Sequence, residues 1–206
     1  KQRVDAMAAY LRQALGVAPG DRVLLMSQNC PQFVTAFYAI LSAGAVVVPV
    51  NPMSKAAEVR FYARDSGARV AFVAQDLLGN VPEGLFEAVV AHAYRDALGT
   101  DYAGDEVPDW VLGTPGGTGA HPTFEAAAGW APVPTGSHTP APDDLAVLPY
   151  TSGTTGHPKG CMHTHATVLA SLAASQVWKG LNVESVVLAV APLFHMLGMQ
   201  NGMNMP

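Results

Sequence analysis

The sequence contains few charged residues, few cysteines and no long apolar run. Charged residues make up 13% of the 206 positions, the formal net charge is −5, and Lys and Arg form no cluster. Nothing in this composition indicates a nucleic-acid partner or an anionic membrane surface. Cys30 and Cys161 lack the spacing of a disulfide framework or a zinc knuckle, which is typical of proteins of the reducing cytoplasm. No apolar run reaches the roughly 18 residues of a membrane-spanning helix, so no integral membrane segment is predicted.

Half of the residues are nevertheless hydrophobic. A chain of 206 residues can bury one large core or two small ones. The high apolar content is explained if part of the surface packs against further protein. We therefore expect the sequence to be a piece of a larger domain. No feature of the sequence predicts an oligomeric state.

Strand-like and helix-like segments alternate in the first third of the chain. Short apolar runs predict strands at 22–26, 46–50 and 69–74, and helical periodicity predicts helices at 5–15, 31–44 and 54–64. Pro31 suits the first turn of its helix, and Gly67 suits the end of the next one. Because no hairpin turn separates the strands, the predicted fold class is α/β, with a largely parallel sheet, flanking helices and right-handed crossovers.

The middle of the chain, 79–142, is a variable, loop-rich segment. Residues 83–98 have helical periodicity, but 88–92 could equally form a strand. Residues 99–120 are predicted to be loop, and the Gly- and Thr-rich stretch 113–119 lacks the following lysine or helix start of a phosphate-binding loop. A short helix is expected at 123–129, and a proline-rich connector at 133–143.

The alternation resumes in the last third of the chain. Apolar runs predict buried strands at 145–148 and 186–191, and a further strand at 160–163. Thr164 is expected to cap a helix at 166–178 that ends before Gly180, and another helix should begin at Met196.

The most informative segment is the loop at 150–160, with the sequence YTSGTTGHPKG. Its glycines allow several backbone N–H groups to converge on one point, and its Ser and Thr hydroxyls add short donors. Lys159 supplies a mobile positive charge that suits a polyphosphate. The preceding strand would place the loop at the carboxyl end of the sheet, where open α/β folds bind ligands. The segment predicts an anion site, with a plain solvent-exposed turn as the alternative.

The loop differs from the P-loop of nucleotide triphosphatases, because His157 and Pro158 separate Gly156 from Lys159. It resembles instead the signature loop of the adenylate-forming enzymes, which include acyl-CoA synthetases, luciferases and the adenylation domains of peptide synthetases. The family form is Thr/Ser-Ser/Thr-Gly-Thr/Ser-Thr-Gly-x-Pro-Lys-Gly, and every position of 151–160 fits it.

Three further segments carry the same resemblance. APLFHMLG at 191–198 is similar to the family's next motif, a strand end whose aromatic pair borders the acyl pocket. LSAGAVVVPVNP at 41–52 resembles an earlier segment that closes a helix and starts a strand. NCPQF at 29–33, followed by FYAIL at 37–41, is most similar to bacterial medium- and long-chain fatty acyl-CoA ligases.

The resemblance implies a cytoplasmic, ATP-dependent acid–CoA ligase. Such an enzyme activates a carboxylic acid as acyl-AMP and transfers the acyl group to coenzyme A. The resemblance to fatty acyl-CoA ligases implies a fatty acid as the substrate. ATP, Mg²⁺ and coenzyme A are the expected ligands. Residues 1–206 would be part of an N-terminal AMP-binding domain, without the small C-terminal domain, and are expected to be inactive alone. An aryl-CoA ligase or a peptide-synthetase adenylation domain would share the loop. A non-catalytic scaffold or partner-binding module is the alternative from another class.

The resemblance also implies a role for individual residues. Residues expected to bind the phosphates of ATP are Thr151, Ser152, Gly153, Thr154, Thr155, Gly156 and Lys159. Thr151 would in addition contact Mg²⁺ through its hydroxyl; the alternative is that this hydroxyl only forms a hydrogen bond with the backbone. Lys159 and His195 are the catalytic candidates, with Lys159 on the β- and γ-phosphates and His195 beside the acyl carboxylate and the α-phosphate. Phe194, His195 and Gly198 would border the acyl pocket, although Phe194 could equally fill the core.

The remaining histidines and Tyr150 are interpreted as structural. His163 and His165 have no third metal ligand nearby in the sequence. His92, His121 and His138 are expected at the surface, and Tyr150 in the core.

Overall fold

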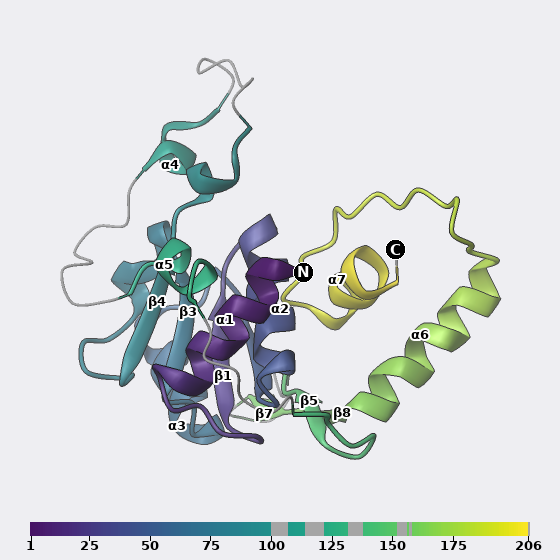
Figure 1. The fold of residues 1–206 in the computed structure, drawn as a ribbon, viewed down its shortest axis with the longest axis horizontal. Coiled ribbons are helices and arrows are strands. Elements are labelled where there is room, and N and C mark those ends of the chain that lie inside the picture. Colours follow the sequence, from purple (N-terminus) through teal and green to yellow (C-terminus); the bar gives the residue numbers. More distant parts are fainter. Residues whose placement is uncertain (100–106, 114–121, 132–137, 152–155, 157, 206) are drawn as a thin grey trace.

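A six-stranded sheet forms the centre of the computed structural model (Figure 1), which describes all residues except 100–106, 114–121, 132–137, 152–155, 157 and 206. The strand order is β4-β3-β1-β2-β5-β8. The strands are β1 (Arg22–Met26), β2 (Val46–Val50), β3 (Val70–Ala74), β4 (Ala88–His92), β5 (Leu145–Val147) and β8 (His163–Thr164). The pairs from β4 to β5 are parallel, and β8 pairs antiparallel with β5. The predicted α/β fold with a largely parallel sheet is confirmed.

Helices cover both faces of the sheet, so the two sides of each strand pack into different cores. In β1, Val23 and Leu25 belong to one apolar cluster, whereas Leu24 and Met26 belong to the other. The first cluster is covered by α1 (Gln2–Gln13), α2 (Pro31–Ser42) and α5 (Phe124–Ala128), and the second by α3 (Ala56–Ser66) and the 3₁₀-helix η1 (Gln75–Asn80). Strands buried on both faces require near-continuous apolar sequence, which is why these runs could be recognised.

The helix ends follow from local chemistry. Cys30 caps α2, because its Sγ accepts a hydrogen bond from the Phe33 N–H at 3.4 Å, and Pro31 takes the first helical position. The α3 helix ends at Gly67, whose φ of +70° is readily adopted only by glycine. The α6 helix (His165–Lys179) begins at Thr164, whose Oγ1 accepts from the Thr167 N–H at 3.2 Å. These predicted boundaries are confirmed to within about two residues.

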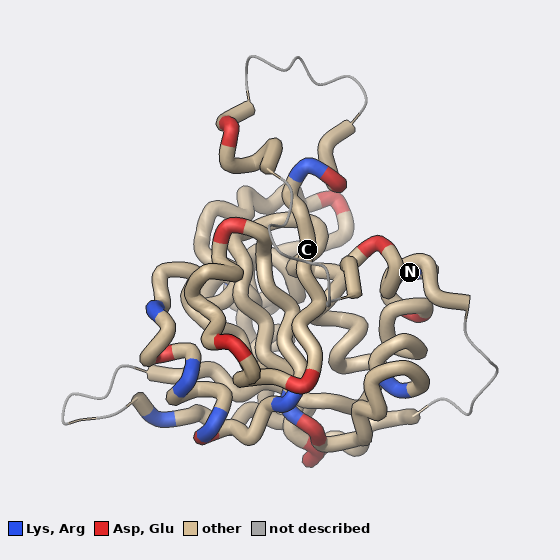
Figure 2. The backbone as a smooth tube through the Cα atoms, turned by 90° about the vertical axis from the view of Figure 1, so that its left-hand side faces the viewer, with Lys and Arg blue, Asp and Glu red and all other residues tan. Residues whose placement is uncertain are grey.

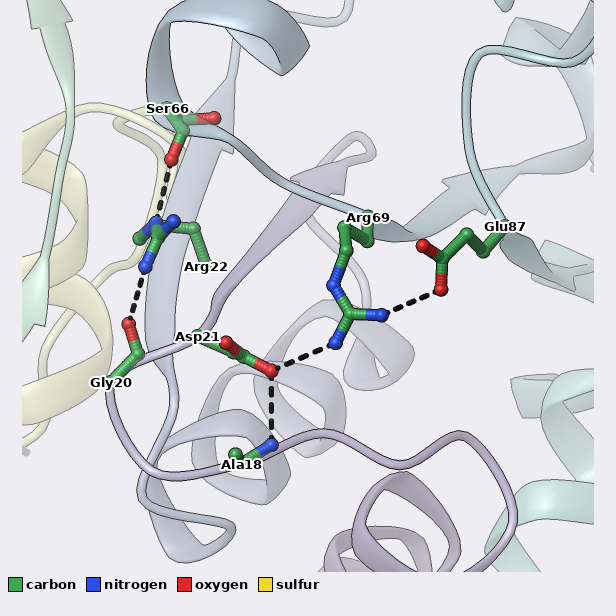
Figure 3. A network of polar contacts seen from close by, with 7 residues as sticks. All are labelled: Ala18, Gly20, Asp21, Arg22, Ser66, Arg69 and Glu87. Carbon is green, nitrogen blue, oxygen red and sulfur yellow. Dashed lines mark hydrogen bonds and ion pairs between the residues drawn. The ribbon is translucent and has the colours of Figure 1, made fainter.

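A polar network joins the amino ends of three neighbouring strands (Figure 3). Arg69, just before β3, pairs with Glu87 at 2.6 Å and with Asp21 at 3.1 Å. Arg22, at the start of β1, donates from Nε to the Ser66 carbonyl at 2.6 Å. Elsewhere Lys and Arg are interspersed with Asp and Glu along the outer segments (Figure 2). The amino-terminal edge of the sheet is thus fastened by surface polar contacts.

The middle segment is more ordered than its composition predicts. The strand at 88–92 is confirmed as β4, and the helical alternative at 83–98 is wrong apart from the short 3₁₀-helix η2 (Tyr94–Ala97). The predicted loop 99–120 contains one helical turn, α4 (Asp109–Leu112), while most of the stretch 113–119 lies outside the described residues. The short helix expected at 123–129 is confirmed as α5.

The prediction of one continuous strand at 160–163 is wrong. Two short pairings replace it: β7 (Lys159–Gly160) pairs with β6 (Tyr150–Thr151), and β8 pairs with β5. The chain changes partner at Cys161 and Met162, so a continuous ladder cannot form.

The predicted buried strand at 186–191 is also wrong. The side chains of Val186, Leu188 and Val190 are 99%, 82% and 74% exposed, and the segment has no regular structure. It follows α6, which extends away from the sheet (Figure 1) and buries none of its own residues. A strand needs a neighbouring strand for its backbone hydrogen bonds, and within the described ranges none lies beside this segment.

The last helical segment returns to the first core. The predicted helix at Met196 is confirmed as α7 (Met196–Met199), and a π-helix η5 (Gln200–Asn204) continues it. Met199 is fully buried in the cluster beneath α2, and the Tyr38 hydroxyl donates to Asn204 Oδ1 at 2.9 Å. In the part of the chain that the structure describes, no helix is both long enough and apolar enough to cross a membrane.

Candidate functional site

A cleft of about 440 Å³ opens where β2 and β6 reach their carboxyl ends. Its walls come from the end of β2 and the loop after it, from Glu58 and Tyr62 of α3, from 149–151, from Cys161 and His163, and from 194–196. The carboxyl edge of a parallel sheet is the usual place for a ligand, because the loops there face one another. Three residues that the sequence assigned to the site therefore share one cavity, namely Thr151, Phe194 and His195, and Tyr150, interpreted from the sequence as structural, lines it too.

The base of the glycine-rich loop is a short antiparallel pair. Thr151 of β6 lies opposite Lys159 of β7, and both residues are exposed. Thr151 lines the cleft, whereas Lys159 is not among the lining residues. Ser152, Gly153, Thr154 and Thr155 lie outside the described residues, so their assignment to phosphate binding stays a prediction. Gly156 has a φ of +151°, within the range that favours glycine.

Glycine at position 160 is explained by close packing at this base. A Cβ on Gly160 would lie 3.1 Å from Leu148 Cδ1 and 3.5 Å from the Tyr150 ring. A side chain at this position would therefore require the Leu148 side chain to move by a few tenths of an ångström.

Tyr150 forms the wall between this loop and α3. Its hydroxyl donates to Asp65 Oδ2 at 2.6 Å, and its ring lies 4.7 Å from the Tyr62 ring, centre to centre. Burial and the adjacent Asp65 carboxylate raise the pKa of the Tyr150 phenol, which therefore stays a neutral donor. Tyr150 is half-buried, as expected for a packing residue, but it also faces the cleft.

His195 sits at the start of α7 and is held in one tautomer by the backbone. Its Nδ1 accepts a hydrogen bond from the Leu197 N–H at 3.2 Å, so this nitrogen carries no proton. In the neutral imidazole the proton is then on Nε2, and His195 is one of the residues that line the cleft. Phe194 lines the cleft and also packs against the first apolar cluster, and its role at the acyl pocket stays a prediction.

Gly198 lies behind this wall. It is buried, and a Cβ there would meet the Pro192 carbonyl and lie 2.7 Å from the Ala191 oxygen. Tight backbone packing thus explains the glycine, and Gly198 is not among the residues that line the cleft. Its role at the acyl pocket stays a prediction.

Several polar residues of the cleft were not selected from the sequence. Asn51, Ser54 and Glu58 come from the loop after β2 and the start of α3, and His163 comes from β8. Asn51 could have been found, because it directly follows a predicted parallel strand. Nothing in the local sequence marks Glu58. His163 was interpreted from the sequence as structural, and its place at the cleft depends on how β8 packs.

His92 is buried, so its expected surface position is wrong. It ends β4, is 1% exposed, and its Nε2 lies 2.9 Å from Ser27 Oγ. Burial lowers the pKa of His92 to about 4, so the ring is neutral near pH 7. Burial also raises the pKa of the nearby Cys30 thiol. The error arose because a lone histidine after an apolar strand gives no sign of a buried hydroxyl partner elsewhere in the sequence. His138 is half-buried, and His121 lies outside the described residues.

The sequence of the chain is similar to those of known proteins over most or all of its length. Residues 1–206 match the family described as AMP-binding enzyme. A long-chain-fatty-acid–CoA ligase of Mycobacterium tuberculosis is 36% identical over 186 residues, which cover 88% of this chain and 32% of that protein. A benzoate–CoA ligase of Thauera aromatica is 32% identical over 213 residues, which cover 99% of this chain and 35% of that protein.

A solved structure has the same fold. The crystal structure of an anthranilate–CoA ligase in complex with anthranoyl-AMP superimposes with a TM-score of 0.76 at 28% identity, covering 100% of this chain and 36% of that one. The chain thus spans about a third of the length of the relatives it matches. On its sequence match and its fold, this chain belongs to the AMP-binding enzyme family.

Proposed function

We propose that the protein to which this chain belongs is an acid–CoA ligase that activates a carboxylic acid with ATP as acyl-AMP and transfers the acyl group to coenzyme A. The observation that carries the proposal is the cleft in which Thr151, at the base of the glycine-rich loop, and His195 face the same cavity. Phosphate-binding and acid-binding groups must meet in this way for the two substrates to react. The relatives' names, which are those of fatty-acid–CoA, benzoate–CoA and anthranilate–CoA ligases, support the same reaction class.

In the first half-reaction a carboxylate oxygen attacks the α-phosphorus of ATP, the bond from that phosphorus to the bridging oxygen breaks, and pyrophosphate leaves. The protein's task is to align the two groups and to stabilise charge. Lys159 and the loop 151–156 would hold the β- and γ-phosphates. In the second half-reaction the thiol of coenzyme A attacks the acyl carbonyl and AMP leaves.

His195 would act on the acid side of the cleft. Because its Nδ1 accepts the Leu197 N–H, its Nε2–H can donate to the carboxylate or to an α-phosphate oxygen without becoming charged. Phe194, which lies beside it on the cleft wall, would cover the apolar part of the acid.

The cleft fits Mg²⁺, which proteins usually bind through one or two carboxylates together with substrate phosphates. Its walls contain the oxygen donors Thr151, Asn51 and Glu58. Among the described residues no three His, Cys, Asp or Glu side chains are grouped to hold a metal on their own. Thr151 would therefore share the ion with ATP, and the bound ion would neutralise phosphate charge.

We propose a fatty acid as the substrate, on the similarity to the long-chain-fatty-acid–CoA ligase. An aromatic acid is the second candidate, because the benzoate–CoA and anthranilate–CoA ligases match nearly all of the chain.

The test is acid-dependent exchange of labelled pyrophosphate into ATP by the purified full-length protein, because residues 1–206 alone are expected to be inactive. Decanoate and benzoate are the probes. Exchange that depends on decanoate supports a fatty-acid ligase, and exchange that depends on benzoate alone supports the aromatic alternative. ATP binding in a calorimeter without exchange for either acid would contradict the enzymatic proposal and favour a binding module. A His195→Ala variant should lose the exchange, whereas His138→Ala, outside the cleft, should keep it.

A further inference from the structure

Asn29, which lies outside the cleft, forms two hydrogen bonds with the segment 191–193 that leads into the cleft wall. The side-chain Nδ2 of Asn29 donates to the Ala191 carbonyl at 3.0 Å, and its Oδ1 accepts from the Leu193 N–H at 2.8 Å. One amide group thus satisfies the acceptor and the donor of two residues that lie more than 160 positions later in the chain. This is the pattern with which one strand pairs with another, supplied here by a single side chain.

The loop that carries Asn29 is itself fixed at the end of β4. Ser27 Oγ lies 2.9 Å from the buried His92 Nε2, and the Gln28 N–H donates to the Tyr94 hydroxyl at 3.3 Å. Gln32, in the first turn of α2, donates from Nε2 to the Ala93 carbonyl at 2.9 Å. Asn29 therefore projects from a loop with contacts on both sides, and its amide is a fixed point rather than a mobile surface group.

The segment that Asn29 holds has little other support before the cleft. Residues 186 and 188–190 are exposed, residue 187 is half-buried, and the segment has no neighbouring strand in the described structure. Directly after the contact, Leu193 is buried, and Phe194 and His195 follow on the cleft wall. Among the described residues, the next hydrogen bond from this part of the chain to α2 is the one between Tyr38 and Asn204, beyond α7. The amide of Asn29 is thus the first polar contact that holds the cleft wall, and the apolar packing of Leu193 follows it.

We propose that Asn29 is a positioning residue, which places Phe194 and His195 on the acid side of the cleft. Its effect on catalysis rests on the function proposed above, whereas its effect on the backbone does not. Asparagine suits the position because it offers a donor and an acceptor on one rigid group. Aspartate would keep the acceptor for Leu193 but would face the Ala191 oxygen with a second oxygen, and alanine would lose both bonds.

The first measurement is hydrogen exchange at the Leu193 amide in the purified protein. Asn29→Ala should speed this exchange about tenfold or more, because the N–H loses its acceptor. Asn29→Asp should keep the slow exchange. The control is Gln28→Ala, which removes a neighbouring exposed side chain and leaves the backbone contact with Tyr94 in place. An unchanged Leu193 amide in Asn29→Ala would overturn the proposal.

The second measurement is the KM for the acid and for ATP in the pyrophosphate exchange, with decanoate and benzoate as probes. Loss of both bonds should raise the KM for the acid about tenfold in Asn29→Ala and less in Asn29→Asp, with the KM for ATP unchanged. A parallel rise in both values would mean that Asn29 only supports the fold, and would overturn the proposal. If the unaltered protein shows no pyrophosphate exchange with either acid, the proposed function fails. Hydrogen exchange at the Leu193 amide then still decides the role of Asn29.

Discussion

At the scale of single residues, the most consequential side chain outside the cleft is a neutral histidine in the core. His92 has a pKa of about 4 in the folded protein, against about 6.5 in an unfolded chain. Between these values the unfolded state binds the additional proton, so folding loses free energy as the pH falls from about 6.5 to 4. This contribution is fully present above the unfolded pKa.

We therefore predict that the unaltered protein loses about 2 kcal/mol more unfolding free energy between pH 7 and pH 5 than a His92→Gln variant. Glutamine does not titrate, and its amide can still reach Ser27. Urea unfolding at the two pH values measures the difference. The control, His138→Gln, should keep the acid sensitivity of the unaltered protein. Equal losses in His92→Gln and the unaltered protein would show that another group is responsible.

Gly198 is the residue at which backbone packing leaves no room. A Cβ would lie 2.5 Å from the Pro192 carbonyl carbon, and a backbone atom cannot move aside as a side chain does. We predict that Gly198→Ala costs about 1–3 kcal/mol of stability and shifts α7 away from the Pro192 turn. The matched control is Gly79→Ala, where a Cβ meets nothing within 4 Å. Thermal unfolding of both variants is the measurement, and similar melting temperatures would contradict the close approach.

At the scale of elements, two apolar runs that look alike in sequence have different fates. Val46–Val50 and residues 186–191 are both rich in valine, and both predict buried strands. The first pairs with β1 and β5 and is buried throughout, whereas the second is exposed. Composition indicates that a segment would be stable if covered on both faces, but not whether the covering elements lie beside it. The first three strands could be predicted, and they lie near one another in the sequence as well as in the sheet.

This difference gives a prediction for a matched pair of leucines. Leu24 in β1 is fully buried and Leu188 is 82% exposed. In this 206-residue chain Leu24→Ala should cost about 2–5 kcal/mol of unfolding free energy, and Leu188→Ala should change it by less than about 0.5 kcal/mol. Urea unfolding of the two variants decides the matter. A large loss in Leu188→Ala would mean that residues 186–191 are covered in solution.

The glycine-rich loop is the second element with a specific expectation. If Lys159 holds the departing pyrophosphate, Lys159→Ala should slow acyl-AMP formation about a hundred- to a thousandfold. Thiolysis of preformed acyl-AMP should change little, because pyrophosphate has already left. Single-turnover rates of the two half-reactions provide the comparison, with Lys1→Ala as the control for loss of a surface charge. Equal slowing of both would assign Lys159 to the fold or to a conformational step.

The candidate site could be predicted in part, for reasons that also lie in its elements. Thr151, Phe194 and His195 belong to contiguous motifs, and the structure brings them to one cleft. Glu58 lines the cleft and Asn29 contacts residues 191 and 193, and only the packing of α3 and the path of the segment 191–193 reveal these positions. A residue that belongs to a contiguous motif can be recognised from the sequence, whereas a contact between two distant segments cannot.

At the scale of the whole molecule, the two edges of the sheet have different tasks. The carboxyl edge carries the cleft, and the amino edge carries the ion pairs of Arg69 with Asp21 and Glu87 (Figure 3). These ion pairs are exposed, so water and salt screen them and their contribution to stability is small. Loops at the carboxyl ends of parallel strands are the ones that contact ligands.

We predict that substitutions at the two edges separate stability from activity. Arg69→Gln should leave kcat/KM of pyrophosphate exchange within about twofold and make stability less dependent on salt, because it removes a screened pair at the surface. Asn51→Ser, at the carboxyl end of β2, should lower kcat/KM about tenfold, because the cleft loses the side-chain amide of Asn51. The hydroxyl of the introduced serine can still accept a hydrogen bond from the Met53 N–H. Exchange rates at two salt concentrations, together with urea unfolding, measure both effects. An activity loss in Arg69→Gln as large as that in Asn51→Ser would mean that the amino edge contributes to the site, and the division of tasks between the two edges would fail.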